Sequence, residues 1–217
     1  MKCKTCSFFL ALAIGALLSF SPSMVHATPV TLTLVGVGGQ SAGPYVFPYY
    51  ISVNDGGLTI TKSLMCLGYF EEISFGESWN ANIVQAAGNT QYEEAAYIFS
   101  LAAAPGASAT TVANAQWANW ELFEPTAAGS LPSSLNQGDI NTLLDNAALY
   151  VSDNPNSILY NSYELYIPVA GSQSSGGIPQ VFMGDPPIIT PEPGSLFLLG
   201  TGLLGLAVFT YRRRRVA

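Results

Sequence analysis

The chain of 217 residues is poor in the side chains that most catalytic and metal sites need. It contains one histidine, His26, and three cysteines, of which Cys3 and Cys6 lie within the first ten residues. Downstream of residue 27 there is no histidine, and Cys66 is the single cysteine. Ser-His-Asp and Cys-His hydrolases need an imidazole, and so do nearly all zinc sites. The body of the chain therefore lacks the residues for most hydrolase and zinc chemistry.

Basic side chains are equally scarce between residues 28 and 192. That stretch carries fourteen acidic residues and one base, Lys62, so its net charge is 1 − 14 = −13. Such a charge disfavours nucleic acid and anionic lipid headgroups as partners, and it suits a secreted protein that must stay soluble. Carboxylates can take up divalent cations, and calcium is the alternative at Asp55, Asp139 or Asp153, although none of these lies in a loop with EF-hand spacing. We expect no metal and no other cofactor.

Residues 1–27 have the pattern of a secretory signal peptide. Lys2 and Lys4 precede an apolar core at residues 8–18, and the segment ends in small residues up to Ala27. A positively charged start, an apolar core and a small-residue cleavage site direct a chain to export, and the segment is then removed. We expect residues 28–184 to form one secreted domain, since about 160 residues are enough for a single core.

The C-terminal part of the sequence combines a rigid tripeptide, an apolar run and a basic stretch. In order, these are Pro191, Glu192 and Pro193, then residues 196–211, then Arg212, Arg213, Arg214 and Arg215. The apolar run has the composition of a membrane helix but is shorter than the roughly 20 residues usually needed to cross a bilayer. Arginines stay on the cytoplasmic side, so the body of the protein is expected outside. We assign residues 185–193 to a linker and residues 194–217 to a transmembrane helix with its Arg-rich tail.

These three parts, in this order, resemble the PEP-CTERM sorting signal. The resemblance implies that a membrane-embedded exosortase reads Pro191, Glu192 and Pro193, processes the tail, and releases or transfers the exported domain. The alternative is an ordinary single-pass anchor in which the prolines are a spacer next to the membrane. The resemblance predicts a membrane-anchored precursor and a final place at the cell surface or outside the cell.

The pattern between residues 28 and 184 changes from strands to helices and back to strands. Extended segments are expected at residues 30–37, 45–53, 58–61, 64–69, 77–84, 157–169 and 180–183. Helices are expected at residues 90–103, 112–123 and 136–149. The turn signal at residues 54–57 predicts a hairpin, and Pro44 and Pro48 predict an edge strand. This order indicates an α+β domain, namely a β-sandwich or barrel-like sheet with a helical insertion.

Helix starts are indicated by short polar signals. Thr90 with Glu93 three residues later predicts a capping box for the first helix. Thr110 or Thr111 is the expected cap of the second helix.

Cys66 and the segment from Gln116 to Trp120 form the one constellation with reactive potential. Their layout resembles the thioester domains of bacterial surface adhesins, in which an early cysteine couples to a glutamine in a Thr-Gln-x-Ala-x-Trp sequence. The resemblance implies Cys66 as the thiol, Gln116 as the acyl donor and Trp120 as a packing aromatic, with surface amines as targets. Ala115 stands where that family has threonine. The alternative is a buried thiol and a surface amide.

Three functions follow from these features. The leading one is a non-enzymatic protein of the cell envelope or biofilm matrix that binds extracellular polysaccharide, because eleven tyrosines and three tryptophans can stack on sugar rings. The alternative is the covalent adhesin with a Cys66–Gln116 thioester. A glycosidase would need two acids about 5 to 9 Å apart across a groove. The acid pairs at 71–72 and 93–94 are adjacent in sequence, and we interpret them as solvated surface.

Overall fold

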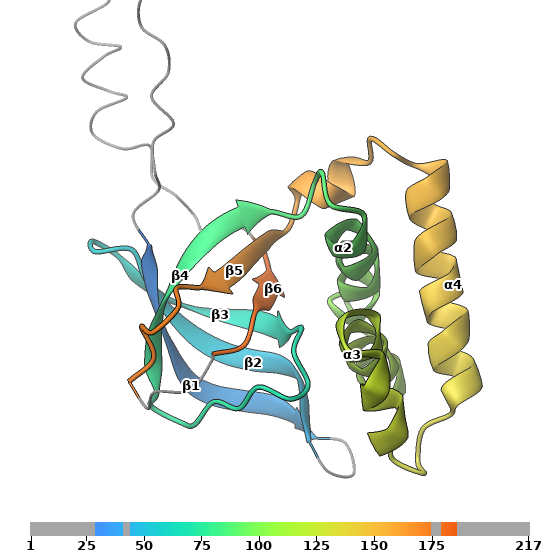
Figure 1. The fold of residues 1–217 in the computed structure, drawn as a ribbon, viewed down its shortest axis with the longest axis horizontal. Coiled ribbons are helices and arrows are strands. Elements are labelled where there is room, and N and C mark those ends of the chain that lie inside the picture. The colour runs from blue at the N-terminus through green and yellow to red at the C-terminus, as the bar shows by residue number, and fades with distance from the viewer. Residues whose placement is uncertain (1–28, 41–43, 175–178, 186–217) are drawn as a thin grey trace, which may run out of the picture.

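The structure is a computed structural model that describes residues 29–40, 44–174 and 179–185. Figure 1 shows its strands gathered into one body, with the helices beside it. The strands are β1 (Val30–Gln40), β2 (Tyr45–Asn54), β3 (Thr59–Cys66), β4 (Ser78–Gln85), β5 (Glu164–Pro168) and β6 (Phe182–Gly184). The α-helices are α2 (Thr90–Ala102), α3 (Ala109–Phe123) and α4 (Gln137–Asp153), and the 3-10 helices are η1 (Pro125–Ser130) and η2 (Ile158–Asn161).

The strands close into a barrel in the order β1-β2-β3-β6-β5-β4. Every neighbouring pair is antiparallel, and β1 completes the ring by pairing with β4. The helices lie between β4 and β5 in the sequence, although these two strands are paired. The sequence predicted either a β-sandwich or a barrel-like sheet, and the structure shows a closed barrel. The predicted helical insertion is confirmed.

The hairpin between β2 and β3 forms where its turn was predicted. The Asp55 carboxylate accepts hydrogen bonds from the backbone N–H groups of Gly57 and Leu58, at 3.0 and 2.8 Å. Gly56 has a φ of 89°, a conformation that a side chain would strain. The strand that follows was predicted as two segments, but residues 59–66 form one continuous strand that ends at Cys66.

The prediction that β2 lies at an edge is wrong, because β2 pairs with both β1 and β3. Pro48 is tolerated because neither ladder needs its missing N–H group. The register with β1 is irregular between Val37 and Gly39, opposite Pro48, and the pairing with β3 begins only at Tyr49. An interior strand accommodates proline at such an irregularity.

The caps of α2 and α3 also differ from the prediction. Asn89, not Thr90, caps α2, since its side chain accepts from the N–H groups of Gln91 and Tyr92. Ser108 caps α3, ahead of the two threonines expected there. Asparagine and serine rank ahead of threonine as N-cap residues, which agrees with these two caps.

The last predicted strand, residues 157–169, is wrong over its first half. Residues 158–161 form η2, and only residues 164–168 form a strand, β5. Ser157 starts η2 by accepting a hydrogen bond from the N–H of Leu159. The alternating side chains predicted a strand here, but the hydrogen bond of the Ser157 side chain starts a helical turn instead.

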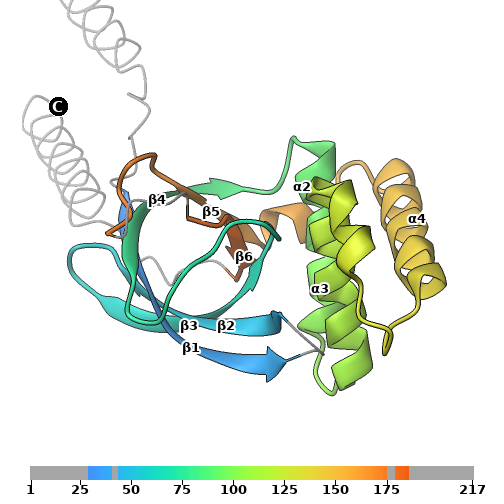
Figure 2. The ribbon, with the colours of Figure 1, turned by 60° about the horizontal axis from the view of Figure 1, so that its bottom comes forward.

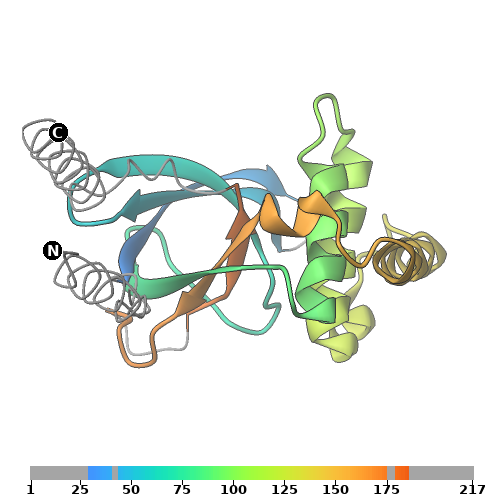
Figure 3. The same ribbon diagram turned by 90° about the horizontal axis from the view of Figure 1, so that it is seen from above.

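Two layers of apolar side chains hold the molecule together. One fills the barrel, where Trp79 and Tyr49 pack against Phe182 at ring distances of 5.9 and 5.6 Å. The other lies between the barrel and the helices, and it includes Phe99 and Trp117. Figures 2 and 3 show α2, α3 and α4 on one side of the barrel, with α4 outermost. The helices therefore cover one side of the barrel.

The predicted signal peptide (1–27), the linker from residue 186 onward and the predicted transmembrane segment (194–217) lie outside the described residues. Within the described ranges, no helix has both the length and the apolar character needed to cross a bilayer.

Candidate functional site

The loop of residues 67–77, which joins β3 to β4, is fastened to the end of α3. The Glu124 carboxylate accepts hydrogen bonds from the backbone N–H groups of Tyr69 and Phe70, at 3.0 and 3.1 Å. Glu124 directly follows α3, whose continuation is stopped by Pro125. Hydrogen bonds to a charged acceptor are about twice as strong as neutral ones, so this contact fixes the loop at the helix end.

A cavity of about 620 Å³, which we call the aromatic pocket, lies on one side of this loop. Its aromatic lining residues are Tyr45, Tyr49, Tyr69, Phe70, Phe75 and Trp120. Phe70 is 60% exposed, Phe75 59% and Tyr45 43%, so three of these rings face solvent. Large exposed apolar side chains gathered in one place are typical of a binding surface.

Polar groups converge on the aromatic pocket as well. Glu71, Glu72 and Gln180 line it together with the rings. The Gln180 side chain is only 7% exposed, and its Nε2 donates hydrogen bonds to the carbonyls of Gly68 and Glu71. Its buried Oε1 has no hydrogen-bond partner in the structure. A cavity with aromatic walls and a few polar groups is the usual form of a ligand site.

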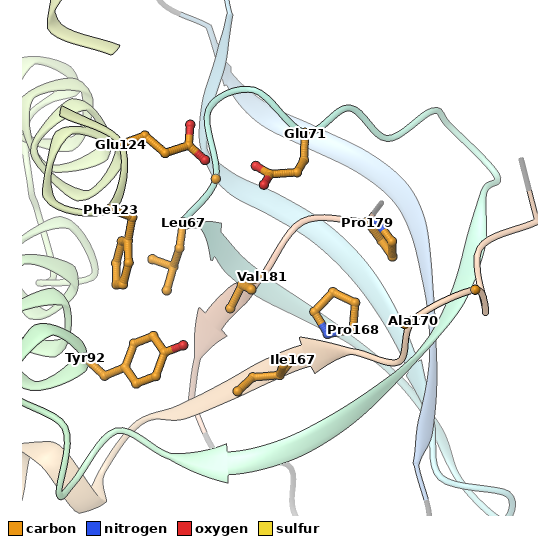
Figure 4. A pocket seen from close by; sticks show the side chains of 12 residues that line it. Leu67, Glu71, Tyr92, Phe123, Glu124, Ile167, Pro168, Ala170, Pro179 and Val181 are labelled. Carbon is orange, nitrogen blue, oxygen red and sulfur yellow. The ribbon is translucent and has the colours of Figure 1, made fainter. Parts of the chain in front are cut away.

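A second cavity, of about 440 Å³, lies between the loop, α2 and the strand ends, and we call it the apolar pocket. Most of its wall is apolar, and the side chains shown in Figure 4 include Leu67, Phe123, Ile167 and Val181. Figure 4 also shows the carboxyl groups of Glu71 and Glu124 pointing toward one another at its upper edge. This cavity is thus apolar with one acidic corner.

The carboxyl groups of Glu71 and Glu124 face one another at this acidic corner. Burial raises the pKa of the Glu71 carboxyl above its usual range, and the charge of Glu124 and the hydrogen bond between the two side chains raise it further. Both carboxyl groups lie at the same edge of the cavity and not across it from one another, so this pair gives the glycosidase hypothesis no support.

The structure brings Cys66 and Gln116 together, as the thioester hypothesis requires, but their contact runs through the backbone. Gln116 Nε2 donates to the Cys66 carbonyl at 2.6 Å, and Gln116 Oε1 accepts from the N–H of Phe47 at 3.1 Å. The Cys66 thiol donates to the Gly68 carbonyl at 2.8 Å. Burial raises the pKa of this thiol to about 12, so it is neutral at physiological pH.

Gln116 therefore joins α3 to two strands of the barrel. Both residues are fully buried, which differs from the surface amide considered as the alternative. The neighbouring Asn119 makes a similar contact, since its Nδ2 lies 2.8 Å from the Met65 sulfur. Trp117 and Trp120 pack edge to face at 5.0 Å, in the layer between helix and barrel. This geometry favours a structural role for the pair, and the thioester stays a prediction.

The remaining predicted residues fall into two groups. Pro191, Glu192, Pro193 and the arginines 212–215 lie outside the described residues. In the part of the chain that the structure describes, no group of three or more His, Cys, Asp or Glu side chains is placed to hold a metal ion.

Sequence reasoning missed the residues that shape the two pockets. Glu124 could have been singled out from the sequence, because an acidic residue between the end of a helix and Pro125 can accept hydrogen bonds from the backbone of another segment. Phe70 and Phe75 stood out as apolar residues in an acidic, glycine-containing loop. Gln180 had no local signal, because its contacts with Gly68 and Glu71 join segments more than one hundred residues apart.

Comparison with known families identifies the C-terminal segment. The family model described as the PEP-CTERM protein-sorting motif matches residues 190–215. Residues 190–215 therefore carry a PEP-CTERM sorting signal, which implies an exported precursor that an exosortase processes. Its sorting signal is the PEP-CTERM motif, as the order of its three parts predicted. Searches among curated proteins and among solved structures each found no match.

Proposed function

We propose that this protein is a non-enzymatic component of the cell surface or extracellular matrix that binds polysaccharide through the aromatic pocket. In this proposal residues 1–27 direct export, residues 28–184 are the binding domain, and residues 185–217 carry the linker, the sorting tripeptide and the membrane segment. Partners are an exosortase, the membrane and an extracellular glycan. The observation that supports it most is the gathering of exposed rings around one cavity.

The three exposed rings come from two separate segments of the chain. Tyr45 starts β2, whereas Phe70 and Phe75 belong to the loop after β3. The rings of Tyr45 and Phe75 lie 6.4 Å apart, edge to face. Sugar rings stack on such aromatic faces while their hydroxyls bond to nearby polar groups, here those of Glu72 and Gln180.

The charge of the site limits the kind of polysaccharide. Glu71 and Glu72 line the pocket, and residues 28–184 carry twelve acidic residues against the single base Lys62, a net charge of 1 − 12 = −11. A glycan rich in carboxylates or sulfates would be repelled. A neutral glycan fits the pocket best.

Affinity electrophoresis of the exported full-length protein in gels containing hydroxyethyl cellulose or dextran tests this proposal. The double variant Phe70→Ala, Phe75→Ala should lose most of the retardation, because two stacking contacts of about 1 kcal/mol each correspond to roughly 30-fold in affinity. Leu149→Ala is the matched control, since Leu149 is 60% exposed on α4, outside the pocket. Equal retardation of wild type and the double variant would refute the assignment of the pocket.

Sorting is tested separately by mass spectrometry of the mature C-terminus with and without exosortase. The proposal expects the tail after Pro193 to be removed only when exosortase is present. Retention of residues 196–217 in both cases would leave an ordinary anchor.

The covalent adhesin remains the second candidate because the Gln116 side chain hydrogen-bonds to the backbone carbonyl of Cys66. A thioester would lower the intact mass by one ammonia, and methylamine would open it to a free thiol and an N-methylamide, one CH2 group heavier than the unmodified chain. It would also require that the two hydrogen bonds of the Gln116 amide be given up. An unchanged mass with an alkylatable thiol after unfolding rejects it.

A further inference from the structure

The backbone in the wall of the apolar pocket offers few groups to a ligand. The Gly68 carbonyl already accepts hydrogen bonds from the Cys66 thiol and the Gln180 side chain, at 2.8 and 3.4 Å. The wall also contains Pro168 and Pro179, which have no N–H group to donate. A molecule in this cavity therefore meets a surface that is mostly apolar.

The Tyr92 hydroxyl is the polar group that a ligand in the cavity can reach. Tyr92 lies in the first turn of α2, and its ring packs against that of Phe123 at a ring distance of 5.6 Å. Figure 4 shows its hydroxyl pointing toward the cavity, on the side of Val181 and Ile167. The hydroxyl is accessible, and none of the described residues hydrogen-bonds to it. A tyrosine hydroxyl can donate one hydrogen bond and accept another.

Charge sets the second requirement for a ligand. Glu71 and Glu124 form the acidic corner, which repels an anion. The corner does not hold a cation either, because the Glu124 carboxylate already accepts from two backbone N–H groups of the loop and Glu71 Oε2 is buried. A charge placed against apolar walls without a partner loses its hydration at a large cost in free energy. The cavity therefore suits an uncharged ligand.

We propose that the apolar pocket binds a small uncharged organic molecule, with an apolar ring against Leu67 and Phe123 and one carbonyl oxygen that accepts a hydrogen bond from the Tyr92 hydroxyl. The volume of about 440 Å³ lies within the range of small-molecule sites. The rings of Tyr92 and Phe123 supply aromatic surface against which a ring of the ligand packs. The ligand carries one polar group, because the cavity offers one hydroxyl to meet it.

Fluorine NMR titration of the full-length protein in detergent tests the proposal with three probes of similar size. These are para-fluoroacetophenone, which has a carbonyl, para-fluorotoluene, which has no polar group, and para-fluorobenzoate, which is an anion. We expect saturable binding of the ketone and the toluene and none of the benzoate. Each probe is compared between variants in the same detergent, so its partitioning into micelles cancels.

The variant Tyr92→Phe removes the hydroxyl and keeps the ring. It should weaken binding of the ketone about 5-fold, as expected for one neutral hydrogen bond, and leave binding of the toluene unchanged. Tyr97→Phe is the matched control, since Tyr97 lies on the same helix, stacks on Tyr150 at 4.6 Å and does not line this cavity. It should change the affinity of neither probe.

The variant Val181→Phe adds a ring to the wall and should abolish binding of both neutral probes. Binding of the benzoate, no saturable binding of the neutral probes, or an equal effect of Tyr92→Phe on ketone and toluene would each overturn the proposal. The double variant Phe70→Ala, Phe75→Ala should leave ketone binding unchanged, because neither ring lines this cavity. Loss of polysaccharide retardation therefore bears on the aromatic pocket alone.

Discussion

Replacing Gln116 by leucine is the sharpest test of how the helices are fixed to the barrel. The substitution conserves volume but removes the acceptor for the Phe47 N–H and the donor for the Cys66 carbonyl. The Phe47 N–H and the Cys66 carbonyl then have no hydrogen-bond partner. Water cannot replace the lost partner, because residue 116 is fully buried. At about 1 to 3 kcal/mol for each orphaned group, we expect a loss of about 3 kcal/mol in the free energy of unfolding.

The assay is urea unfolding of the full-length protein followed by tryptophan fluorescence. All three tryptophans are buried, and Trp117 and Trp120 lie on α3 itself. With a urea dependence of about 2 kcal/mol per molar, a loss of about 3 kcal/mol lowers the midpoint by roughly 1.5 M. The fluorescence of α3 should change in the same transition as the barrel.

Gln91→Leu is the matched control. Gln91 lies on the surface of α2 and makes one exposed hydrogen bond, to the Leu122 carbonyl at 2.7 Å. Its loss should cost less than about 1 kcal/mol. If Gln116→Leu shifted the midpoint no more than Gln91→Leu, Gln116 would not be the link between helix and barrel, and our account of this contact would be wrong.

Three further predictions concern single residues. Cys66 should resist alkylation in the folded protein and react fully in urea, because burial raises its pKa to about 12 and shields it; quantitative alkylation without urea would contradict this. The pKa of Glu71 is higher in the folded protein than its unfolded value of about 4.5, because burial disfavours the charged carboxylate. The stability that proton binding by Glu71 contributes is therefore complete below pH 4.5, and it is lost as the pH rises through the folded pKa. Wild type should therefore lose more stability than Glu71→Gln between pH 4 and 8, and parallel curves would contradict a raised pKa of Glu71. Gly184→Ala should destabilise by about 1 to 3 kcal/mol, because its Cβ would collide with Leu64, whereas Gly129→Ala, with open space around it, should not.

The sequence was most informative where local chemistry decides the structure. The turn at residues 54–57 and the three helices were predicted because glycine geometry, caps and a helical stripe act over a few residues. The order of strands, helices and strands along the chain was enough to predict that the helices are inserted between two groups of strands. The C-terminal signal was readable for the same reason, since its three parts are contiguous.

Long-range pairing could not be read in this way. β6 has three residues and pairs with β3 and β5, so it carries too little pattern to distinguish a barrel from a sandwich. The position of β2 inside the sheet depends on an irregular register that one strand alone does not show. The pockets depend on Glu124 meeting a loop that lies more than fifty residues earlier, a contact that no spacing within either segment reveals.

β6 is the last strand of the barrel, and it lies only a few residues before the sorting motif in the sequence. The barrel cannot close until residues 182–184 have left the export channel, so the domain completes its fold late, when the sorting segment is the next to emerge. Six residues, 185–190, then separate the last strand from Pro191, and a chain of that length reaches at most about 20 Å. An enzyme that cuts at the tripeptide must therefore reach a site within about 20 Å of the folded barrel. Its access to the tripeptide depends on how closely the barrel approaches the membrane.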